Sequence, residues 1–244
     1  MRGPDALLQL GYVSPLPVVD AMHYEFYQVV PSGIVFIASP LAVSQFSPTA
    51  VADALAGAAD SVDYLAARRV DRIVYGGLPV SAIAGRASML ARMDAQQQRI
   101  GIRVTSDFED AIEALQFMSS RRIAIAAKWK PAVIQAVVRY LADAGIDCVG
   151  AHGGDYDASD VAAIDTSKSV GLGVALGRRA LAAHPSADAL LLGGGTWLSI
   201  PICAALEREF ERPVVSNMTA AFWNALRQFG RAPAPGLACR LLAA

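Results

Sequence analysis

The chain of 244 residues has few of the side chains from which metal and thiol sites are built. It contains three cysteines and three histidines, widely separated and without a CxxC pair. Zinc sites need several such ligands at short spacings, so we expect no metal site. Cys148, Cys203 and Cys239 are each expected to be a small buried side chain and not a reactive thiol.

Strong charge and long apolar runs are also missing. The formal net charge is −1 and no basic stripe is present, which argues against a nucleic-acid partner. Although 54% of the residues are hydrophobic, no apolar run reaches the roughly 18 residues that a membrane-spanning helix needs. The N-terminal segment lacks the apolar core of a secretion signal. These absences predict a cytoplasmic protein that binds neither nucleic acid nor membrane.

Short apolar runs alternate with helix-like segments along the whole sequence. The expected strands are residues 8–13, 33–38, 72–75, 100–104, 122–126, 147–151, 189–192 and 213–216. The expected helices are residues 48–68, 81–98, 107–119, 131–144, 167–183, 200–210 and 220–229, with Asp107 as the expected cap of the third. Most of these strands are continuously apolar, which is typical of parallel strands covered on both faces. The alternation therefore predicts an α/β fold with parallel sheets.

The two halves of the chain resemble each other. Residues 72–77 and residues 190–195 each read as a buried strand followed by a glycine turn. We predict two facing doubly wound parallel-sheet units, one of residues 1–118 plus 217–244 and the other of residues 119–216. Ligands bind beyond the carboxyl ends of strands in such sheets. Both glycine turns are therefore expected in one cleft between the units.

The turn at residues 193–196, with the sequence GGGT, is the strongest indication of a ligand site. Glycines leave backbone N–H groups accessible at the N-terminus of the next helix, where an anion is favoured. We expect Gly194, Gly195 and Thr196 to hold a carboxylate, and Gly76 and Gly77 to act likewise in the first half. Tight helix packing is the structural alternative for each turn. No GxxxxGK[ST] motif is present, so a nucleotide is not expected.

Proton donors must come from outside the glycine turns. Lys128, one of only three lysines, follows an apolar strand. A lysine there can neutralise a carboxylate, or act as an acid if burial lowers its pKa. His23 and Glu25 follow the first strand and are the other candidate acid and base. The structural alternatives are a solvated loop around Lys128 and a surface helix that begins near His23.

Three segments of the second half carry a family resemblance. They are DALLLGGGT at residues 188–196, PVVSN at residues 213–217 and AFWNALR at residues 221–227. Together they resemble the aspartate/glutamate racemase superfamily, in particular its arylmalonate decarboxylase and maleate cis–trans isomerase branch. The first-half segment that ends at Gly77 and the strand before Lys128 fit the same template. The resemblance implies two α/β units related by a pseudo-two-fold axis, without a metal or organic cofactor.

The resemblance also implies which positions form the site. The superfamily's catalytic cysteines correspond to Gly76 and Gly194 in this chain, and its hydroxyl donors after the first turn correspond to Gly77 and Leu78. With glycine at both cysteine positions, we expect neither two-base racemisation nor thiolate attack on maleate.

Other positions of the superfamily site keep polar or aromatic side chains. The superfamily's tyrosine after the middle strand corresponds to Trp129. Thr196 and Ser216 match donor positions, and Ser14 lies in the loop expected to contact the substrate. We therefore expect Ser14, Trp129, Thr196 and Ser216 to bind the substrate.

These observations predict a cofactor-independent lyase of the decarboxylase type, or an isomerase, that acts on a small carboxylic acid. Its proton would come from Lys128, His23 or water. The alternative is a catalytically silent homologue that only binds a carboxylate. The sequence leaves the substrate and the oligomeric state open, a homo-oligomer included.

Overall fold

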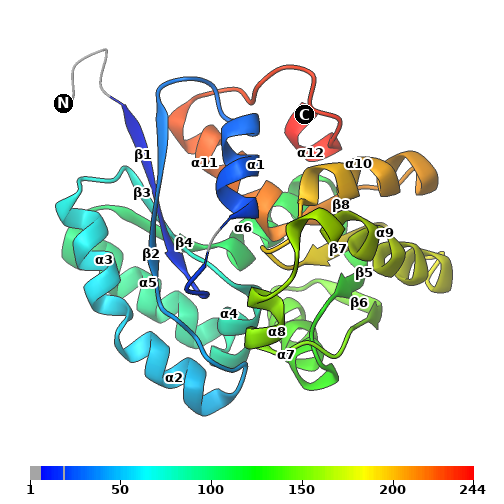
Figure 1. Ribbon diagram of the computed structural model, residues 1–244, viewed down its shortest axis with the longest axis horizontal. Coiled ribbons are helices and arrows are strands. Elements are labelled where there is room, and N and C mark those ends of the chain that lie inside the picture. The colour runs from blue at the N-terminus through cyan, green and yellow to red at the C-terminus, as the bar shows by residue number, and fades with distance from the viewer. Residues whose placement is uncertain (1–6, 19) are drawn as a thin grey trace.

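The computed structural model describes residues 7–18 and 20–244, and in this part of the chain the strands form two sheets. The two sheets lie on opposite sides of the molecule in Figure 1. The first has the order β2-β1-β3-β4 and consists of β1 (Leu8–Ser14), β2 (Ile34–Pro40), β3 (Arg72–Tyr75) and β4 (Arg103–Ser106). The second has the order β6-β5-β7-β8 and consists of β5 (Arg122–Ala127), β6 (Asp147–His152), β7 (Ala189–Gly193) and β8 (Val214–Ser216).

Helices connect the strands and cover both sheets. The first half contains α1 (Ala21–Val29), α2 (Pro48–Ala56), α3 (Ala58–Ala67), α4 (Leu78–Ala84), α5 (Arg86–Ile100) and α6 (Asp107–Phe117). The second half contains α7 (Pro131–Ala142), α8 (Ala158–Ala162), α9 (Thr166–Ala183), α10 (Ser199–Phe210), α11 (Asn217–Phe229) and α12 (Arg240–Ala243). No helix in the described part of the chain is long and apolar enough to cross a membrane.

The predicted fold class is confirmed. All strand pairs are parallel. The two sheets have the same strand order: the first strand of each half, β1 or β5, lies between the second and the third strand of that half, and the fourth strand lies at the far edge. The interior strand β5 is buried from Ile123 to Ala127, as expected when helices cover both faces of a parallel sheet. The shared order relates the two units by a pseudo-two-fold axis.

Several predicted boundaries are wrong, each for a local reason. The expected helix at 48–68 is two helices, α2 and α3, that meet at Gly57. The expected helix at 81–98 divides at Gly85, whose φ of +84° lies in a region that glycine adopts readily. The predicted strand at 100–104 is shifted to β4, and α1 is the helix near His23 that was given as the structural alternative to a role in catalysis. The cap of α6 is Ser106, whose hydroxyl accepts the Glu109 N–H, and not Asp107.

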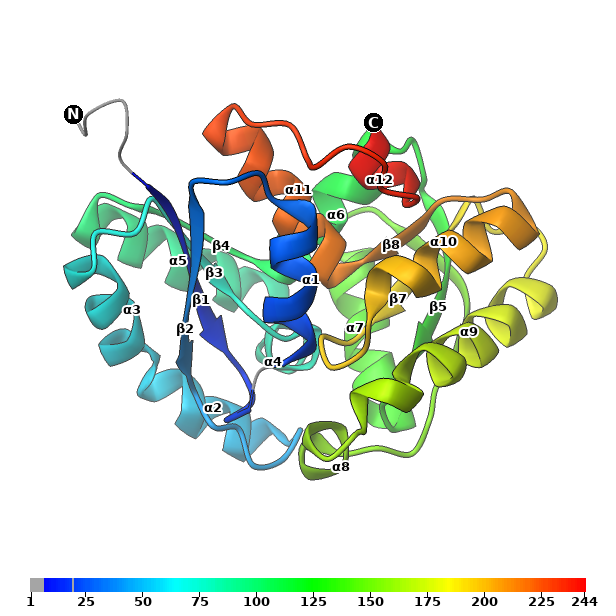
Figure 2. The same ribbon diagram turned by 45° about the horizontal axis from the view of Figure 1, so that its top comes forward.

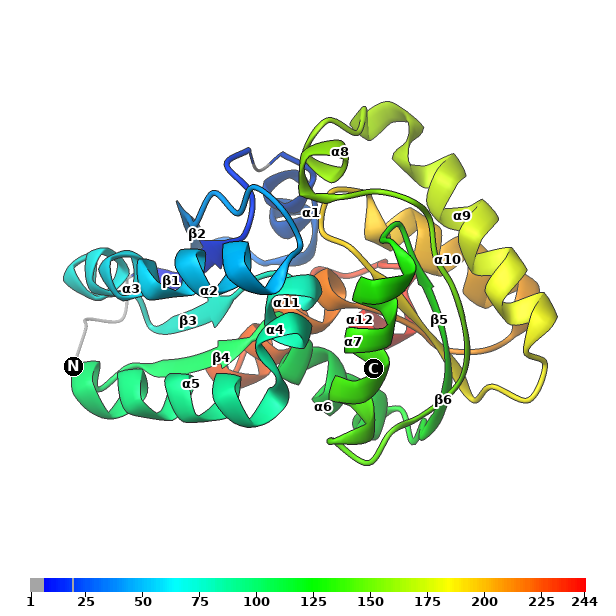
Figure 3. The same cartoon turned by 90° about the horizontal axis from the view of Figure 1, so that it is seen from below.

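Helices from the two units pack directly against each other. Phe108 of α6 stacks on Tyr140 of α7 with ring centroids 4.1 Å apart. α11 returns from the second sheet to α6, where the Asn224 side chain donates to Asp110 and Glu113. Figure 3 shows α11, α6, α4 and α7 along the line between the sheets. This packing supports grouping residues 217–244 with the first unit, although the division itself stays a prediction and residues 1–6 lie outside the described chain.

Candidate functional site

A pocket lies between the two sheets, at the carboxyl ends of their strands. It is lined by Tyr12, Ser14, Pro15, Leu16, Val18, Asp20, Met22, Phe46, Gly77, Leu78, Pro79, Trp129, Val161, Gly194, Gly195, Thr196 and Asn217. The volume open to the centres of water molecules is about 40 Å³. Roughly 10–15 Å³ of such volume holds one water, so the pocket admits only a small ligand.

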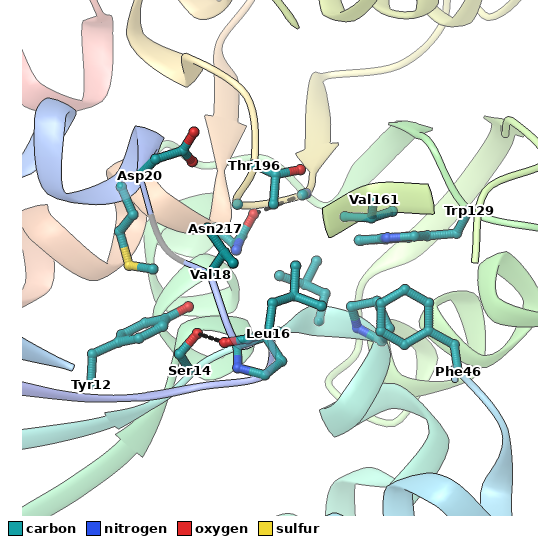
Figure 4. Close-up of a pocket in the computed structure, with 17 residues that line it drawn as sticks. Tyr12, Ser14, Leu16, Val18, Asp20, Phe46, Trp129, Val161, Thr196 and Asn217 are labelled. Carbon is teal, nitrogen blue, oxygen red and sulfur yellow. Dashed lines mark hydrogen bonds between the residues drawn. The ribbon is translucent and has the colours of Figure 1, made fainter. Parts of the chain in front are cut away.

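The pocket wall is mostly apolar, and both units contribute polar side chains to it, among them Tyr12, Ser14, Asp20, Thr196 and Asn217. Trp129, Val161 and Phe46 gather at one end of the pocket, and Tyr12 and Ser14 lie at the other (Figure 4). The Ser14 hydroxyl donates to the Leu16 carbonyl oxygen at 2.8 Å, so it already has a partner within its own loop. An apolar wall with a few polar groups is typical of sites for small organic ligands.

The second glycine turn differs from the predicted anion site. The helix that follows it, α10, begins only at Ser199, and its N-terminus is occupied by the carboxylate of Glu25. Glu25 accepts hydrogen bonds from the Ser199 hydroxyl and the Ile200 N–H, at 2.5 and 2.6 Å. The anion that this helix N-terminus attracts is therefore a side chain of the protein itself.

The N–H groups of the second turn are only partly free. The Gly194 N–H donates to Asn217 Oδ1 at 3.1 Å. Within the described chain, the N–H groups of Gly195 and Thr196 have no protein acceptor. Both residues line the pocket, so two backbone donors and the Thr196 hydroxyl are available to a ligand there.

Lys128 lies immediately behind this turn. Its side chain is fully buried, and Nζ donates to Thr196 Oγ1 at 2.9 Å and lies 3.9 Å from the centroid of the Trp197 ring. No carboxylate of the described residues forms an ion pair with it. Burial lowers the pKa of Lys128 to about 7. A buried lysine without a counterion beside a pocket is typical of a functional site.

Glycine is required at the turns because other side chains fill the space beside them. A Cβ at Gly194, whose φ is +136°, would lie 3.0 Å from Lys128 Nζ. A Cβ at Gly193 would lie 2.6 Å from the Trp129 ring, and one at Gly76 would lie 2.2 Å from the Tyr12 ring. Lys128 and Tyr12 thus occupy the space next to Gly194 and Gly76, where the resemblance predicts cysteines.

The first glycine turn does not offer the predicted carboxylate site. The Gly77 N–H donates to Asp107 Oδ2 at 2.8 Å, so it is not free for a ligand. The residues that follow, Leu78 and Pro79, are apolar and line the pocket. Gly76 does not line it. The predicted role of Gly76 and Gly77 in holding a carboxylate therefore lacks a free donor on this side of the pocket.

A buried hydrogen-bond network connects the two turns. Asp107 Oδ2 accepts from Asn217 Nδ2 at 2.7 Å and from the Tyr12 hydroxyl at 3.2 Å, besides the Gly77 N–H. Asn217 Oδ1 in turn accepts the Gly194 N–H. Burial raises the pKa of Asp107 to about 7, although its three donors oppose the shift.

Three other predicted site residues have structural roles. His23 packs edge-on against Phe36, with ring centroids 4.7 Å apart, and Glu25 caps α10. α1, which carries both, lies between the units in Figure 1 and Figure 2. Ser216 is the N-cap of α11 and accepts the Thr219 N–H. His23, Glu25 and Ser216 do not line the pocket, whereas Ser14, Gly77, Trp129, Gly194, Gly195 and Thr196 do.

Four polar residues at or beside the pocket were missed by the sequence analysis: Tyr12, Asp20, Asp107 and Asn217. Tyr12 was hidden within an apolar strand. Asp107 gave a signal that was misread, because an acidic residue at the start of a helix is usually its cap. Asn217 had the clearest signal, since it follows a strand at the carboxyl edge of the sheet, where ligand sites are found.

The cysteines lie away from the pocket. Cys203 and Cys239 are fully buried and Cys148 is half-buried on the edge strand β6. A hydrogen bond with Cys239, and then burial, raise the pKa of the Cys203 thiol. None of the three lines the pocket. Among the described residues, no group of three histidine, cysteine or acidic side chains is placed to hold a metal ion.

Two similar parallel-sheet units that enclose a small apolar pocket define an α/β protein of the two-unit class with its site between the units. A family model for arylmalonate decarboxylase matches residues 10–242, and the chain belongs to this family. It is similar to arylmalonate decarboxylase of Bordetella bronchiseptica, with 27% identity over 196 residues and 80% of each chain covered.

Solved structures have the same fold. A liganded arylmalonate decarboxylase with a glycine-to-cysteine and a cysteine-to-serine exchange superposes with a TM-score of 0.83, at 25% identity over 94% of this chain and 97% of that one. A maleate cis–trans isomerase variant of Nocardia farcinica, which carries a covalently bound succinylcysteine intermediate, has a TM-score of 0.83 at 21% identity, covering 97% and 98% of the two chains. This second likeness shows the fold alone.

Proposed function

We propose that the protein is a cofactor-independent lyase that removes CO₂ from a small carboxylic acid of the substituted malonate type. The observation that carries this proposal is Lys128, a buried lysine without a counterion that contacts the pocket through Thr196. Membership of the arylmalonate decarboxylase family supports the reaction class. Lys128 itself does not line the pocket, so the chemistry is assigned to the pair that it forms with the pocket-lining Thr196, and not to a thiol.

One substrate carboxylate binds at the second turn. Lys128 donates to Thr196 Oγ1, so the hydrogen of the Thr196 hydroxyl is free to point into the pocket. It joins the free N–H groups of Gly195 and Thr196 as a donor to the carboxylate. These donors are fixed in place before the reaction, which is how developing charge is stabilised most effectively. The Lys128 ammonium neutralises the bound anion.

The second carboxylate of the substrate faces the apolar wall formed by Leu78, Pro79 and neighbouring side chains. The bond between the α-carbon and this carboxylate breaks, CO₂ leaves, and the bonding electron pair stays on the α-carbon. The retained carboxylate delocalises this pair as an enediolate, which the donors of the second turn stabilise. An apolar wall favours the step because the charged carboxylate becomes neutral CO₂.

The proton that completes the product comes from Lys128 through Thr196. The ammonium gives a proton to Thr196 Oγ1 while the hydroxyl hydrogen moves to the α-carbon. The product is a monocarboxylate, and the neutral amine takes up a proton from water. A pKa of about 7 suits this role, because a general acid works best when its pKa lies near the working pH.

The second candidate is binding of a carboxylate without turnover. It is favoured by one observation: no cysteine lines the pocket, whereas thiol chemistry is seen in the Nocardia farcinica isomerase. An isomerase is the other form of the catalytic candidate, and it would convert its substrate without releasing CO₂. The two candidates differ in a single measurable respect, the formation of product.

The test combines ligand binding with CO₂ release. A thermal-shift screen of methyl- and phenylmalonate, phenylacetate, maleate, succinate and nucleotides should show stabilisation by malonates and phenylacetate and none by nucleotides. A ligand at one hundred times its Kd adds about 2.7 kcal/mol, which corresponds to several degrees for a chain of this size. CO₂ release from the malonates should follow, and the Lys128→Met variant should lose about 10²–10⁴-fold in kcat.

Lys130→Met is the matched control. Lys130 lies two residues away but is partly exposed and pairs with Asp157 at 3.3 Å, so its loss should leave turnover within about twofold. Binding with no CO₂ release from any malonate would favour the silent candidate. Stabilisation by nucleotides and by no acid would contradict both candidates.

A further inference from the structure

The pair Asp107 and Asn217 lies at equivalent places in the two units. Each residue follows the last strand of its sheet, comes directly after a capping serine and begins a helix, α6 or α11. Each side chain accepts the N–H of the glycine turn of its own half, Gly77 or Gly194. The two side chains meet between the units, where Asn217 Nδ2 donates to Asp107 Oδ2 at 2.7 Å.

Backbone donors fix the direction of these hydrogen bonds. The Gly194 N–H can only donate, so the amide oxygen of Asn217 must face it and the amide nitrogen must face Asp107. The Gly77 N–H can likewise only donate, so Asp107 Oδ2 must accept. The pair therefore consists of one acceptor and one donor, and an aspartate at both positions would place two acceptors face to face.

Charge is distributed unequally as a result. Asp107 has no ion-pair partner among the described residues. Asp110, one turn further along α6, is paired with Arg72, so that arginine serves a different carboxylate. The first turn thus has the Asp107 carboxyl group bonded to its N–H, whereas the N–H of the second turn is bonded to a neutral amide, with Lys128 on the other side of that turn. Asp20 is a further carboxylate that lines the pocket, and its oxygens accept hydrogen bonds from the Ala21 N–H and the Thr166 hydroxyl.

We propose that Asp107 and Asn217 are positioning residues that determine which glycine turn receives the substrate carboxylate. Asp107 keeps the first turn free of anions, and the neutral Asn217 leaves the second turn open to one. This inference rests on the proposed function, since it assigns the orientation of the substrate in that pocket. Neither residue has to take part in proton transfer.

The orientation has a consequence for the class of substrate. The retained carboxylate lies at Gly195 and Thr196, and the rest of the substrate extends toward Gly77, Leu78 and Pro79. A carboxylate near the first turn is repelled until it leaves as neutral CO₂. Acids with one anionic end and one apolar end should therefore bind well as products. A dicarboxylate that needs both turns at once, such as maleate, should bind poorly.

Exchanging the two residues tests the proposal. In the double variant Asp107→Asn/Asn217→Asp, the pseudo-two-fold axis gives the pair an equivalent donor and acceptor arrangement, while the charge moves to the second turn. Asn217→Asp alone places two carboxylates face to face. In urea unfolding, the double variant should therefore be more stable than Asn217→Asp alone. Its loss of unfolding free energy should be smaller than the sum of the losses in the two single variants.

Two readouts separate positioning from a merely structural role. The first is the Kd of phenylacetate. It should be at least about tenfold larger in the double variant, even though the hydrogen bonds that hold the pair in the fold are restored in this variant. The second is the pKa of Lys128, followed by ¹³Cε NMR in the ligand-free protein. It should rise by at least about one unit, because a carboxylate at position 217 would accept the Gly194 N–H, and Gly194 lies beside the Lys128 side chain.

The outcomes decide as follows. Recovery of wild-type phenylacetate affinity in the double variant, or an unchanged pKa of Lys128, would overturn the proposal.

If the wild type binds no carboxylate, the proposed function fails. The pKa of Lys128 in the double variant still decides whether the pair controls the charge of the second turn. If the double variant does not fold, Asp107→Asn serves instead: its preference for phenylacetate over maleate should fall at least about fivefold, and an unchanged preference would contradict the inference.

Discussion

The two glycine turns follow equivalent strands of equivalent sheets, yet they present different chemistry to the pocket. The turn after β3 is followed by Leu78 and Pro79, and its Gly77 N–H is taken by Asp107. The turn after β7 keeps two N–H groups and the Thr196 hydroxyl free, with Lys128 behind it. Two halves built on one plan thus differ in the hydrogen-bond donors that they leave free, and under the proposed function one half holds an anion while the other excludes it.

The largest expected effect on ligand binding concerns Thr196. Thr196→Val removes the hydroxyl that would donate to the carboxylate, and it should weaken phenylacetate binding by about 1.5–3 kcal/mol, the range for a hydrogen bond to a charged group. Isothermal titration calorimetry measures this directly. Ser14→Ala is the matched control on the first unit, because the Ser14 hydroxyl is already bonded to Leu16. Equal losses in both variants would show that the carboxylate does not choose the second turn.

The second prediction concerns the space beside the first turn. Gly76→Ala places a Cβ 2.2 Å from the Tyr12 ring, so the ring must move and its hydrogen bond to Asp107 is strained. We expect a loss of about 1–3 kcal/mol in the free energy of unfolding. Gly57→Ala is the control: φ is −79°, the nearest atom is 3.8 Å away, and stability should be unchanged or slightly raised. Tolerance of alanine at Gly76 would mean that Tyr12 does not fill the space there.

The third prediction is a pH dependence of stability. The pKa of Lys128 is lowered to about 7 in the folded protein from an ordinary 10.5. The folded state therefore loses stability as the pH falls from about 10 to about 7, and the loss is constant below that. Lys128→Met removes this cost and should raise the free energy of unfolding by on the order of 2 kcal/mol at pH 6, with little gain near pH 10.

Urea unfolding at several pH values measures this difference. The raised pKa values of Asp107 and Asp110 destabilise the fold as the pH rises through about 4–7. They are present in both proteins and cancel in the comparison. A gain that grows toward high pH would show that Lys128 is stabilised as a cation by a group other than Thr196 and Trp197.

The smallest effect is expected for the cysteines. Cys148→Ser and Cys203→Ala should leave kcat and the Kd of phenylacetate within about twofold, because neither thiol lines the pocket. Cys203→Ala should cost some stability, since it leaves a small cavity in the core. Loss of turnover in a folded Cys203→Ala protein would bring thiol chemistry back into consideration.

The sequence predicted part of the site. Trp129 and Thr196 line the pocket and Lys128 lies behind it. Each could be selected from the sequence because it follows a strand whose carboxyl end faces the ligand side of a parallel sheet, and their roles with a substrate stay predictions. Glu25 and Asp107 were misread because both are acidic residues near the start of a helix. The local sequence does not show which helix, if any, such a residue caps. Glu25 caps α10, which lies about 175 residues further along the chain, and Asp107 leaves the capping of α6 to Ser106.

By itself the sequence determined the fold class, the two-fold plan and the position of the pocket, because apolar periodicity and glycine placement are local properties that parallel sheets require. Only the tertiary structure decided which N–H groups stay free and that Lys128 lacks a counterion. It also decided that Asp107 and Asn217 meet between the units. These features depend on partners from distant segments, and burial and hydrogen bonding of a side chain exist only once those segments are packed together.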